Sequence, residues 1–220
     1  RLIYVSSPSV IFDGRSHVAA TEAAPFPNRF QSVYALTKKL GEDRVREAGQ
    51  GGLETVIIRP KAIFGPGDRS LLPNLVAVAR RGGLPQIGNG RNLVDLTYVE
   101  NVAHALTLAL EAPAACGRTY HITNDEHLLL WDVIRYVLSR LGLHLRRRRL
   151  PLPAALLAAT LMEAQAQING RPPRLTRYTV GILARTQTYD IAAARADLGY
   201  RPLVAVAAGI EQTLRLWREA

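Results

Sequence analysis

The stretch Thr55-Val56-Ile57-Ile58-Arg59-Pro60 decides the fold class of this 220-residue chain. Its first four residues are β-branched, and three of them are apolar, without the alternation of a half-buried strand. Such a run predicts a short strand that is buried on both faces, which is typical of parallel sheets covered by helices. The Arg-Pro pair marks the end of the strand.

The residues on either side of this strand extend the same pattern. Leu2 to Val5 form a second apolar run that ends in Ser6-Ser7-Pro8, and a helix is expected over 32–48, followed by glycines. Residues 13–29 are expected to form a long loop. Further helices are expected over 71–81, 101–111, 131–141, 150–162, 191–198 and 208–218, and extended segments over 93–99 and 119–123. This alternation predicts an α/β fold with a parallel sheet.

The charge balance argues against some classes of partner. The chain has 28 Lys and Arg against 18 Asp and Glu, a net charge of +10. A nucleic-acid interface is not expected, because the charge is scattered and its one dense run, Arg146 to Arg149, has no interleaved aromatic residues. The single cysteine, Cys116, excludes an internal disulfide and is expected to be a small core residue in a reducing compartment. No signal peptide and no membrane-spanning run were found, and no bound metal is expected.

Tyr34 and Lys38 are the first candidates for chemistry. They lie four residues apart on the predicted helix, so both side chains leave the same face. A neighbouring ammonium group favours the phenolate and lowers the pKa of a tyrosine, which then exchanges protons more readily near neutral pH. The alternative is an ordinary pair on a helix surface, and the Tyr-x-x-x-Lys pattern alone is weak.

A serine at the end of the first strand strengthens this prediction. Open α/β sheets bind their ligands beyond the carboxyl ends of their strands, where Ser6 and Ser7 lie. A hydroxyl group there can hydrogen-bond to a developing alkoxide or orient a substrate oxygen beside Tyr34. The alternative is a serine that caps a turn.

Further motifs follow the two serines along the chain. In order, the set is Tyr4-Val5-Ser6-Ser7, Tyr34-x-x-x-Lys38, Arg59-Pro60, Gly65-Pro66-Gly67-Asp68, Gly88-Asn89-Gly90-Arg91-Asn92, Asp95-Leu96-Thr97-Tyr98-Val99, Asn101-Val102-Ala103 and Leu198-Gly199-Tyr200-Arg201-Pro202. This ordered set resembles the extended short-chain dehydrogenases/reductases of the NAD-dependent epimerase/dehydratase superfamily. The motifs from Gly88 onward resemble the branch with 3β-hydroxysteroid dehydrogenases, sterol-4α-carboxylate 3-dehydrogenases and 2-alkyl-3-oxoalkanoate reductases.

The resemblance implies a role for each residue. Ser7 is the implied catalytic serine, with Ser6 as the alternative, Tyr34 is the acid/base, and Lys38 binds the nicotinamide ribose. The cofactor, NAD or NADP, is expected to contact Tyr34, Lys38, Pro60, Lys61, Ala62 and Ile63. Many relatives have histidine where Lys61 stands, so a solvated loop lysine is the equal alternative there. The substrate is expected to contact Ser7, Pro8, Ser9, Thr97 and Tyr98.

The resemblance also implies how the chain is organised. Residues 1–83 and 100–124 are expected to form the C-terminal half of a Rossmann-type doubly wound sheet, and 84–99 and 125–220 a small, mostly helical substrate-binding lobe. The Gly-rich dinucleotide fingerprint was not found, and the chain begins with Arg1 in a strand. We therefore expect an N-terminally truncated fragment that binds dinucleotide weakly or not at all. The residue that selects NAD or NADP follows a strand that is not present.

The basic and apolar segment Arg146–Met162 leaves two interpretations open. Four arginines before an apolar helix suit an anionic membrane surface, whereas a solvated run before a pocket-lining helix is favoured, because prolines interrupt the stretch. Localisation is therefore expected to be cytoplasmic, with a membrane-peripheral alternative. Relatives often pair through helices such as 32–48, so the resemblance allows a homodimer.

Three functions remain under consideration. The favoured one is an NAD(P)-dependent oxidoreductase that acts on a 3-hydroxy or 3-oxo group of an apolar substrate, of the steroid or long-chain 3-oxoacyl type. A nucleotide-sugar epimerase or dehydratase is the first alternative, with Arg91 and Arg174 as candidate diphosphate ligands. The second alternative is a non-catalytic NAD(P)-binding protein, which the presence of Ser7, Tyr34 and Lys38 disfavours.

Overall fold

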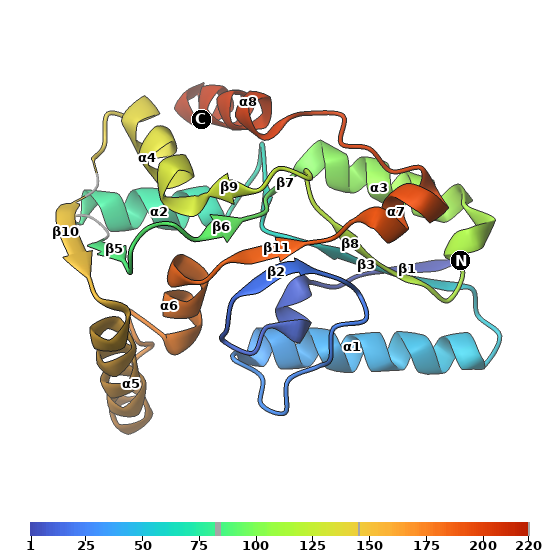
Figure 1. Ribbon diagram of the computed structural model, residues 1–220, viewed down its shortest axis with the longest axis horizontal. Coiled ribbons are helices and arrows are strands. Elements are labelled where there is room, and N and C mark those ends of the chain that lie inside the picture. The colour runs from blue at the N-terminus through green and yellow to red at the C-terminus, as the bar shows by residue number, and fades with distance from the viewer. Residues whose placement is uncertain (82–84, 145, 220) are drawn as a thin grey trace.

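A three-stranded parallel sheet lies at the centre of one part of the molecule (Figure 1). The computed structural model describes residues 1–81, 85–144 and 146–219, without the side chains of 146–148, 218 and 219. The sheet order is β1-β3-β8, with β1 at Leu2–Val5, β3 at Thr55–Pro60 and β8 at Thr119–Ile122. All six residues of β3 are buried, which confirms the doubly covered strand expected from its sequence.

Helices cover both faces of this sheet. Helix α1 (Val33–Gln50) packs on one face, and α3 (Val99–Glu111) and α7 (Ala192–Leu198) pack on the other (Figure 1). Val56 and Ile58 point toward α3 and α7 and form one core with them. The expected doubly wound α/β arrangement is therefore confirmed.

Helix α1 starts and packs for reasons that are visible in its sequence. The side chain of Ser32 caps the helix by accepting a hydrogen bond from the backbone N–H of Ala35 at 3.2 Å. Gly41 faces Tyr4, and a Cβ atom at this position would collide with the tyrosine ring. The glycine therefore lets α1 approach β1 closely.

The other part of the structure is mostly helical, as expected. Its helices are α2 (Leu71–Arg80), α4 (Leu130–Arg140), α5 (Leu152–Asn169), α6 (Arg177–Ala184) and α8 (Val206–Glu219). Trp131 is fully buried between α4, α5 and α6, and its indole N–H donates to Leu183 O at 3.0 Å. The domain boundaries proposed from the sequence stay a prediction.

Several short strands were not predicted, whereas β6 and β7 lie within the extended segment expected over 93–99. A four-stranded sheet has the order β2-β11-β6-β9, from His17–Ala20, Gln187–Tyr189, Leu93–Val94 and Leu128–Leu129. Two strand pairs join β10 (Arg146–Leu150) to β5 (Pro85–Ile87) and β4 (Ile63–Phe64) to β7 (Thr97–Tyr98). Two short 3-10 helices are η1 (Pro8–Ile11) and η2 (Pro113–Ala115). Strands this short show no hydrophobic period, because partners distant in sequence define them.

The segment after residue 144 therefore differs from expectation. The arginine run lies in strand β10, where no strand was expected, and the following helix runs to Asn169 instead of residue 162. Helix α6 was not expected either. The side chains of residues 146–148 lie outside the described part of the chain, so the structure gives no account of their solvation.

Candidate active site

The two adjacent serines at the carboxyl end of β1 point to different partners. Ser6 is buried, and its hydroxyl donates to Glu42 Oε1 at 2.6 Å. Ser7 Oγ instead accepts a hydrogen bond from the backbone N–H of Ser9 at 3.2 Å and donates to Ser9 Oγ at 3.0 Å. Ser6 is thus part of an internal charged network, which leaves Ser7 as the better candidate for contact with a substrate.

Helix α1 brings Lys38 and Tyr34 to the same strand end. Lys38 Nζ donates to the carbonyl oxygen of Val5 at 2.8 Å, and it lies 6.0 Å from the ring centroid of Tyr34. It also lies 5.2 Å from the ring centroid of Tyr4. The ring of Tyr34 is half exposed. The structure therefore brings the ammonium group of Lys38 to Val5, which precedes Ser7 by two residues in the chain.

Tyr178 is a neighbour of this site that the sequence did not predict. Its hydroxyl lies 3.1 Å from Ser9 Oγ, so a row of hydroxyls joins Ser7, Ser9 and Tyr178. Burial raises the pKa of Tyr178, the hydrogen bond from Ser9 opposes this, and the nearby Tyr34 adds to it. Helix α6 carries Tyr178 and is capped by Thr176, whose side chain accepts a hydrogen bond from the N–H of Thr179 at 3.0 Å. This capping pattern is the one sequence signal that would have indicated the helix.

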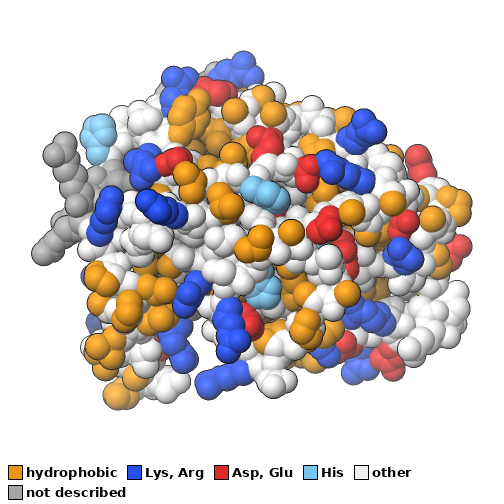
Figure 2. Space-filling view, in the orientation of Figure 1, with side chains coloured by type: hydrophobic (Ala, Val, Ile, Leu, Met, Phe, Trp, Pro, Cys, Tyr) orange, Lys and Arg blue, Asp and Glu red, His pale blue; other side chains and the backbone are white. Residues whose placement is uncertain are grey.

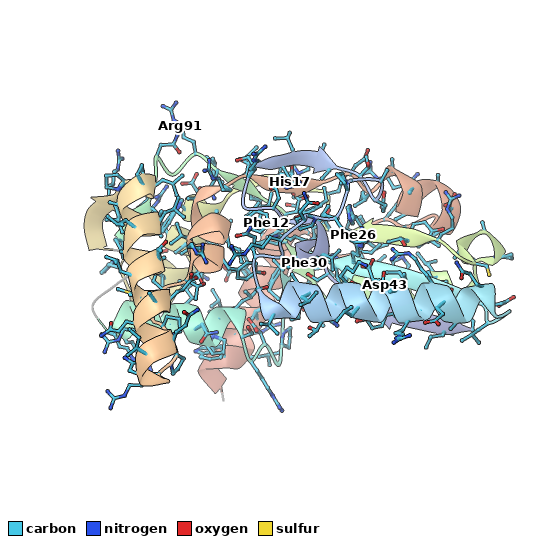
Figure 3. The ribbon with its side chains drawn as sticks, turned by 90° about the horizontal axis from the view of Figure 1, so that it is seen from below. Phe12, His17, Phe26, Phe30, Asp43 and Arg91 are labelled. Carbon is cyan, nitrogen blue, oxygen red and sulfur yellow. The ribbon has the colours of Figure 1, made fainter. Side chains whose placement is uncertain are left out.

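A buried ion pair lies behind the site. Arg59 at the end of β3 donates to both oxygens of Glu42 at 2.7 Å, in the two-pronged geometry that suits Arg and carboxylate. Burial acts to raise the pKa of Glu42, but hydrogen bonds from Arg59, Ser6 and Arg46 outweigh it, so the pKa lies below its ordinary value. The Arg59 guanidinium lies 5.6 Å from the ring centroid of Phe26, in the loop that Figure 3 shows above α1. These contacts tie α1 to the ends of β1 and β3.

The segment Pro60–Ile63 leaves the sheet with an unusual backbone. Ala62 has a φ of 45°, in the left-handed region that residues with a Cβ seldom adopt. Thr97 holds this turn, because its hydroxyl donates to Lys61 O at 2.6 Å and lies 3.0 Å from Ile122 O. Such local strain gathers at functional sites and is held there by the surrounding structure. The turn is the segment to which the resemblance assigns the nicotinamide.

Lys61 is not a solvated loop lysine, and that alternative is wrong. The side chain is buried, and Nζ donates to Gln187 Oε1 at 2.6 Å and lies 5.6 Å from the ring centroid of Tyr189. Burial lowers the pKa of Lys61 to about 8, although the charge of Asp95 opposes this shift. The Lys61 side chain packs against β11. Contact between a cofactor and the backbone of Lys61 remains a prediction, whereas its ammonium group is directed away toward Gln187.

Thr97 and Tyr98 have internal roles. Both are fully buried. Thr97 holds the Pro60–Ile63 turn, and the hydroxyl of Tyr98 donates to Gln212 Oε1 at 2.5 Å. Substrate contact by these two side chains stays a prediction, and the structure gives it no support. Pro8 and Ser9, by contrast, lie in η1, which packs beside α1.

The residues present fit one end of a nicotinamide dinucleotide. The Lys38 ammonium lies beside Tyr34 and has three N–H donors, one of which bonds Val5 O. The other two N–H groups are the donors that ribose hydroxyls need. The turn at Ala62 exposes part of its neighbour Ile63. A Gly-rich loop that would hold the pyrophosphate does not occur in a strand-to-helix position of this sequence. Within the described residues, no group of His, Cys, Asp and Glu is arranged to hold a metal ion.

Sequence comparison relates the chain to known oxidoreductases. The model of the 3-beta hydroxysteroid dehydrogenase/isomerase family matches residues 1–153. The chain is 41% identical to 3beta-hydroxysteroid-dehydrogenase/decarboxylase isoform 2 of Arabidopsis thaliana, over 97% of this chain and 41% of that protein. It is 36% identical to 2-alkyl-3-oxoalkanoate reductase of Stenotrophomonas maltophilia (strain K279a), over 96% of this chain and 67% of that protein. The chain spans about half the length of the two Arabidopsis thaliana relatives that it matches.

Solved structures show the same fold. The crystal structure of gox2253 has a TM-score of 0.74 at 24% identity, over 99% of this chain and 66% of that one. A dTDP-glucose 4,6-dehydratase from Streptomyces venezuelae, a double mutant with NAD bound, has a TM-score of 0.70 at 24% identity, over 99% of this chain and 59% of that one. At these identities, the likeness supports the Rossmann-type arrangement and not a reaction.

Proposed function

The chain belongs to the 3-beta hydroxysteroid dehydrogenase/isomerase family, and we propose that its protein is an NAD(P)-dependent oxidoreductase acting on a 3-hydroxy or 3-oxo group. One observation carries the proposal. The hydrogen bond from Lys38 to Val5 O joins helix α1 to the end of β1, and so places an ammonium group between Tyr34 and the strand that leads to Ser7. The names of the relatives, which are dehydrogenases and a reductase, support the same reaction class.

Tyr34 is the proposed proton donor and acceptor. Its ring is half exposed, so its hydroxyl is accessible to a substrate. The bond to Val5 O holds the ammonium group of Lys38 in place beside the ring of Tyr34 during the reaction. In oxidation Tyr34 takes the proton from the substrate hydroxyl, and in reduction it returns a proton to the new alkoxide.

Ser7 is the proposed hydrogen-bond partner of the substrate oxygen. It caps η1, which fixes its backbone, and Ser9 holds its hydroxyl. Tyr178 in turn holds Ser9, so a residue of the helical lobe supports the orientation of Ser7. The single O–H of Ser7 is donated to Ser9 here, so it has to turn toward the substrate oxygen before it can stabilise negative charge there.

The nicotinamide cofactor supplies the chemistry that these side chains lack, since its ring accepts or donates the hydride when bound. Lys38 is proposed to hold the ribose, and the turn from Pro60 to Ile63 is proposed to form one wall for the ring. Thr97 keeps this turn in place.

The proposed substrate is an apolar molecule of the steroid or long-chain 3-oxoacyl type. Printed names of relatives include sterol-4-alpha-carboxylate 3-dehydrogenases and 2-alkyl-3-oxoalkanoate reductases, which supports this class. A nucleotide-sugar substrate would need cations near the site. Arg91 and Arg174 are both exposed, and Figure 3 shows Arg91 pointing outward and far from the loop above α1, so the alternative has less support.

The test is an assay of the intact gene product with NADH and NADPH against a 3-ketosteroid, a 3-oxoacyl acid and UDP-sugars. Tyr34→Phe is expected to lower turnover on the preferred substrate by about 10²- to 10⁴-fold, the usual contribution of a positioned proton donor. Tyr136→Phe is the control, since Tyr136 is another exposed tyrosine but lies on α4. Full activity in Tyr34→Phe would disprove the role of Tyr34.

A homodimer is a further part of the proposal. Val33, Leu36 and Leu40 leave α1 on its solvent side and are 77%, 39% and 52% exposed. An apolar surface of this kind favours association. Sedimentation velocity over a range of concentrations tests whether the protein is a dimer.

A further inference from the structure

Tyr178 connects the helical part of the molecule to the segment that carries Ser7. It lies in the first turn of α6, and its hydroxyl oxygen is 3.1 Å from Ser9 Oγ. Its ring stands edge-on to the ring of Phe12, the residue after η1, with the two ring centroids 6.2 Å apart. The tyrosine therefore meets the segment from Ser7 to Phe12 with both its hydroxyl and its ring.

Helix α6 is packed on two sides, which fixes this contact. It lies between α5 and the segment with β2 (Figure 1), and the exposed apolar side chains over α5 lie at the lower left in Figure 2. Arg177, next to Tyr178, donates to Glu163 of α5 through its backbone N–H at 2.8 Å and through its side chain at 2.7 Å. Gly181 lies so close to Phe12 that an added Cβ would be 3.0 Å from the ring. The hydroxyl of Tyr178 is therefore presented by a packed helix.

The single O–H group of Ser7 has two possible acceptors. In this structure it donates to Ser9 Oγ at 3.0 Å, and in the proposed reaction it donates to the substrate oxygen. Ser9 Oγ loses a donor when the O–H of Ser7 turns to the substrate. A polar group that loses a partner on turning opposes that turn, so Ser9 competes with the substrate for Ser7.

Tyr178 can supply the donor that Ser9 loses. Either hydroxyl can be the donor in the contact between Ser9 and Tyr178, and a serine oxygen can accept two hydrogen bonds while it donates its own proton. Burial raises the pKa of Tyr178 above its ordinary value, against a smaller opposing effect of the hydrogen bond with Ser9. The phenol therefore keeps its proton and stays available as a donor.

We propose that Tyr178 is a positioning residue that releases the Ser7 hydroxyl toward the substrate. When the substrate oxygen arrives, the O–H of Ser7 turns to it and Tyr178 donates to Ser9 in its place. The backbone N–H of Ser9 still donates to Ser7 Oγ at 3.2 Å and keeps that oxygen where it is. The inference rests on the proposed function, because it needs Ser7 as the partner of the substrate oxygen.

A passive brace would rank the variants in the opposite order. If Ser9 and Tyr178 only held Ser7 in a productive orientation, Ser9→Ala would be the more harmful change, since Ser9 bonds Ser7 directly. In the proposed arrangement, Ser9→Ala removes the competing acceptor, whereas Tyr178→Phe leaves the competitor without its second donor. Tyr178→Phe is then the more harmful change.

The test is a comparison of these variants in the intact gene product, with saturating NADH or NADPH and the preferred substrate. Tyr178→Phe keeps the ring beside Phe12 and is expected to lower kcat by about fivefold, the effect of one neutral hydrogen bond, without a change in the KM for the cofactor. Ser9→Ala is expected to lower kcat less than Tyr178→Phe does. A kcat in Ser9→Ala as low as in Tyr178→Phe, or lower, would overturn the proposal.

A double-mutant cycle shows whether Tyr178 acts through Ser7. Tyr178→Phe is expected to have no further effect on the residual kcat of Ser7→Ala, because the hydroxyl that it releases is gone. The control is Tyr136→Phe, which removes the hydroxyl of an exposed tyrosine on α4 and is expected to leave kcat unchanged in both backgrounds. The same loss from Tyr178→Phe with and without Ser7 would mean that Tyr178 acts on the substrate or the fold by another route, and it would contradict the proposal.

The outcomes separate this inference from the proposed function. Strong loss of activity in Tyr34→Phe together with an unchanged kcat in Tyr178→Phe would remove the role of Tyr178 and leave the oxidoreductase assignment intact. Full activity in both Tyr34→Phe and Ser7→Ala would remove the proposed mechanism and the role of Tyr178 with it.

Discussion

Helices α1 and α5 have the same length, 18 residues, and opposite chemistry. On its inner side, α1 places Lys38 on a backbone carbonyl and Glu42 on two arginines and a serine. The inner side of α5 offers alanines and leucines to neighbouring apolar residues. Directional bonds fix the angle at which side chains leave α1, whereas apolar packing holds α5 without fixing any polar group.

This difference separates the parts that each helix plays. A proton-transfer site needs its groups in a defined geometry, and charged hydrogen bonds provide that geometry at the cost of desolvation. A helix that only packs in an apolar core needs buried area and no fixed polar partner. The chemistry of the inner contacts therefore agrees with a site on α1 and with a packing role for α5.

Removing the charge from Glu42 is the strongest test of the first half of this comparison. Glu42→Gln is expected to lower the free energy of unfolding by about 3–5 kcal/mol, because the buried Arg59 guanidinium loses its partner. Urea denaturation measures the change. The control is Glu47→Gln on the same helix, which breaks the exposed pair with Arg44 and is expected to cost at most about 0.5 kcal/mol. Similar losses in both variants would mean that the buried pair does not hold α1.

A pH series on Lys61→Met tests whether the ammonium group of Lys61, next to the Pro60–Ile63 turn, is buried as a charge in the folded protein. The pKa of Lys61 is lowered to about 8 in the folded protein, so between that pH and the ordinary lysine value the unfolded chain binds more protons. The free energy of unfolding of the wild type is therefore expected to rise by about 2 kcal/mol relative to that of Lys61→Met between pH 7.5 and 9.5. Urea denaturation of both proteins at each pH gives this difference. A constant difference would show that Lys61 is not buried as a charged group.

Glutamine placed on each face of α5 tests the apolar packing of this helix, the second half of the comparison. Ala159→Gln is expected to destabilise by about 1–3 kcal/mol, because the side chain is fully buried and the core has to give way. Leu157→Gln, at a position on the outer face of α5 that is 63% exposed, is expected to change stability by less than about 0.5 kcal/mol. Thermal and urea unfolding measure both effects. A large loss in Leu157→Gln would show that the outer face of α5 supports the fold itself.

The candidate site was predictable in part from the sequence because its signals are local. The spacing of Tyr34 and Lys38 on one helix and the position of Ser7 after a strand each follow from short-range geometry. The choice between Ser6 and Ser7 was not predictable, because it depends on Glu42, which is 36 residues away from Ser6. Tyr178 was missed for the same reason, since its partner Ser9 is 169 residues distant.

The sequence by itself determined the α/β class, the strands β1 and β3 that precede and follow α1, and the helical face shared by Tyr34 and Lys38. Hydrophobic run length and helical period carry this information, and both are local properties of a chain. Only the tertiary structure decided that Lys61 is buried, that Thr97 holds a turn, and that one face of α5 has no partner within the described chain. Burial and hydrogen bonding between distant residues depend on which elements pack together, and no window of sequence contains that information.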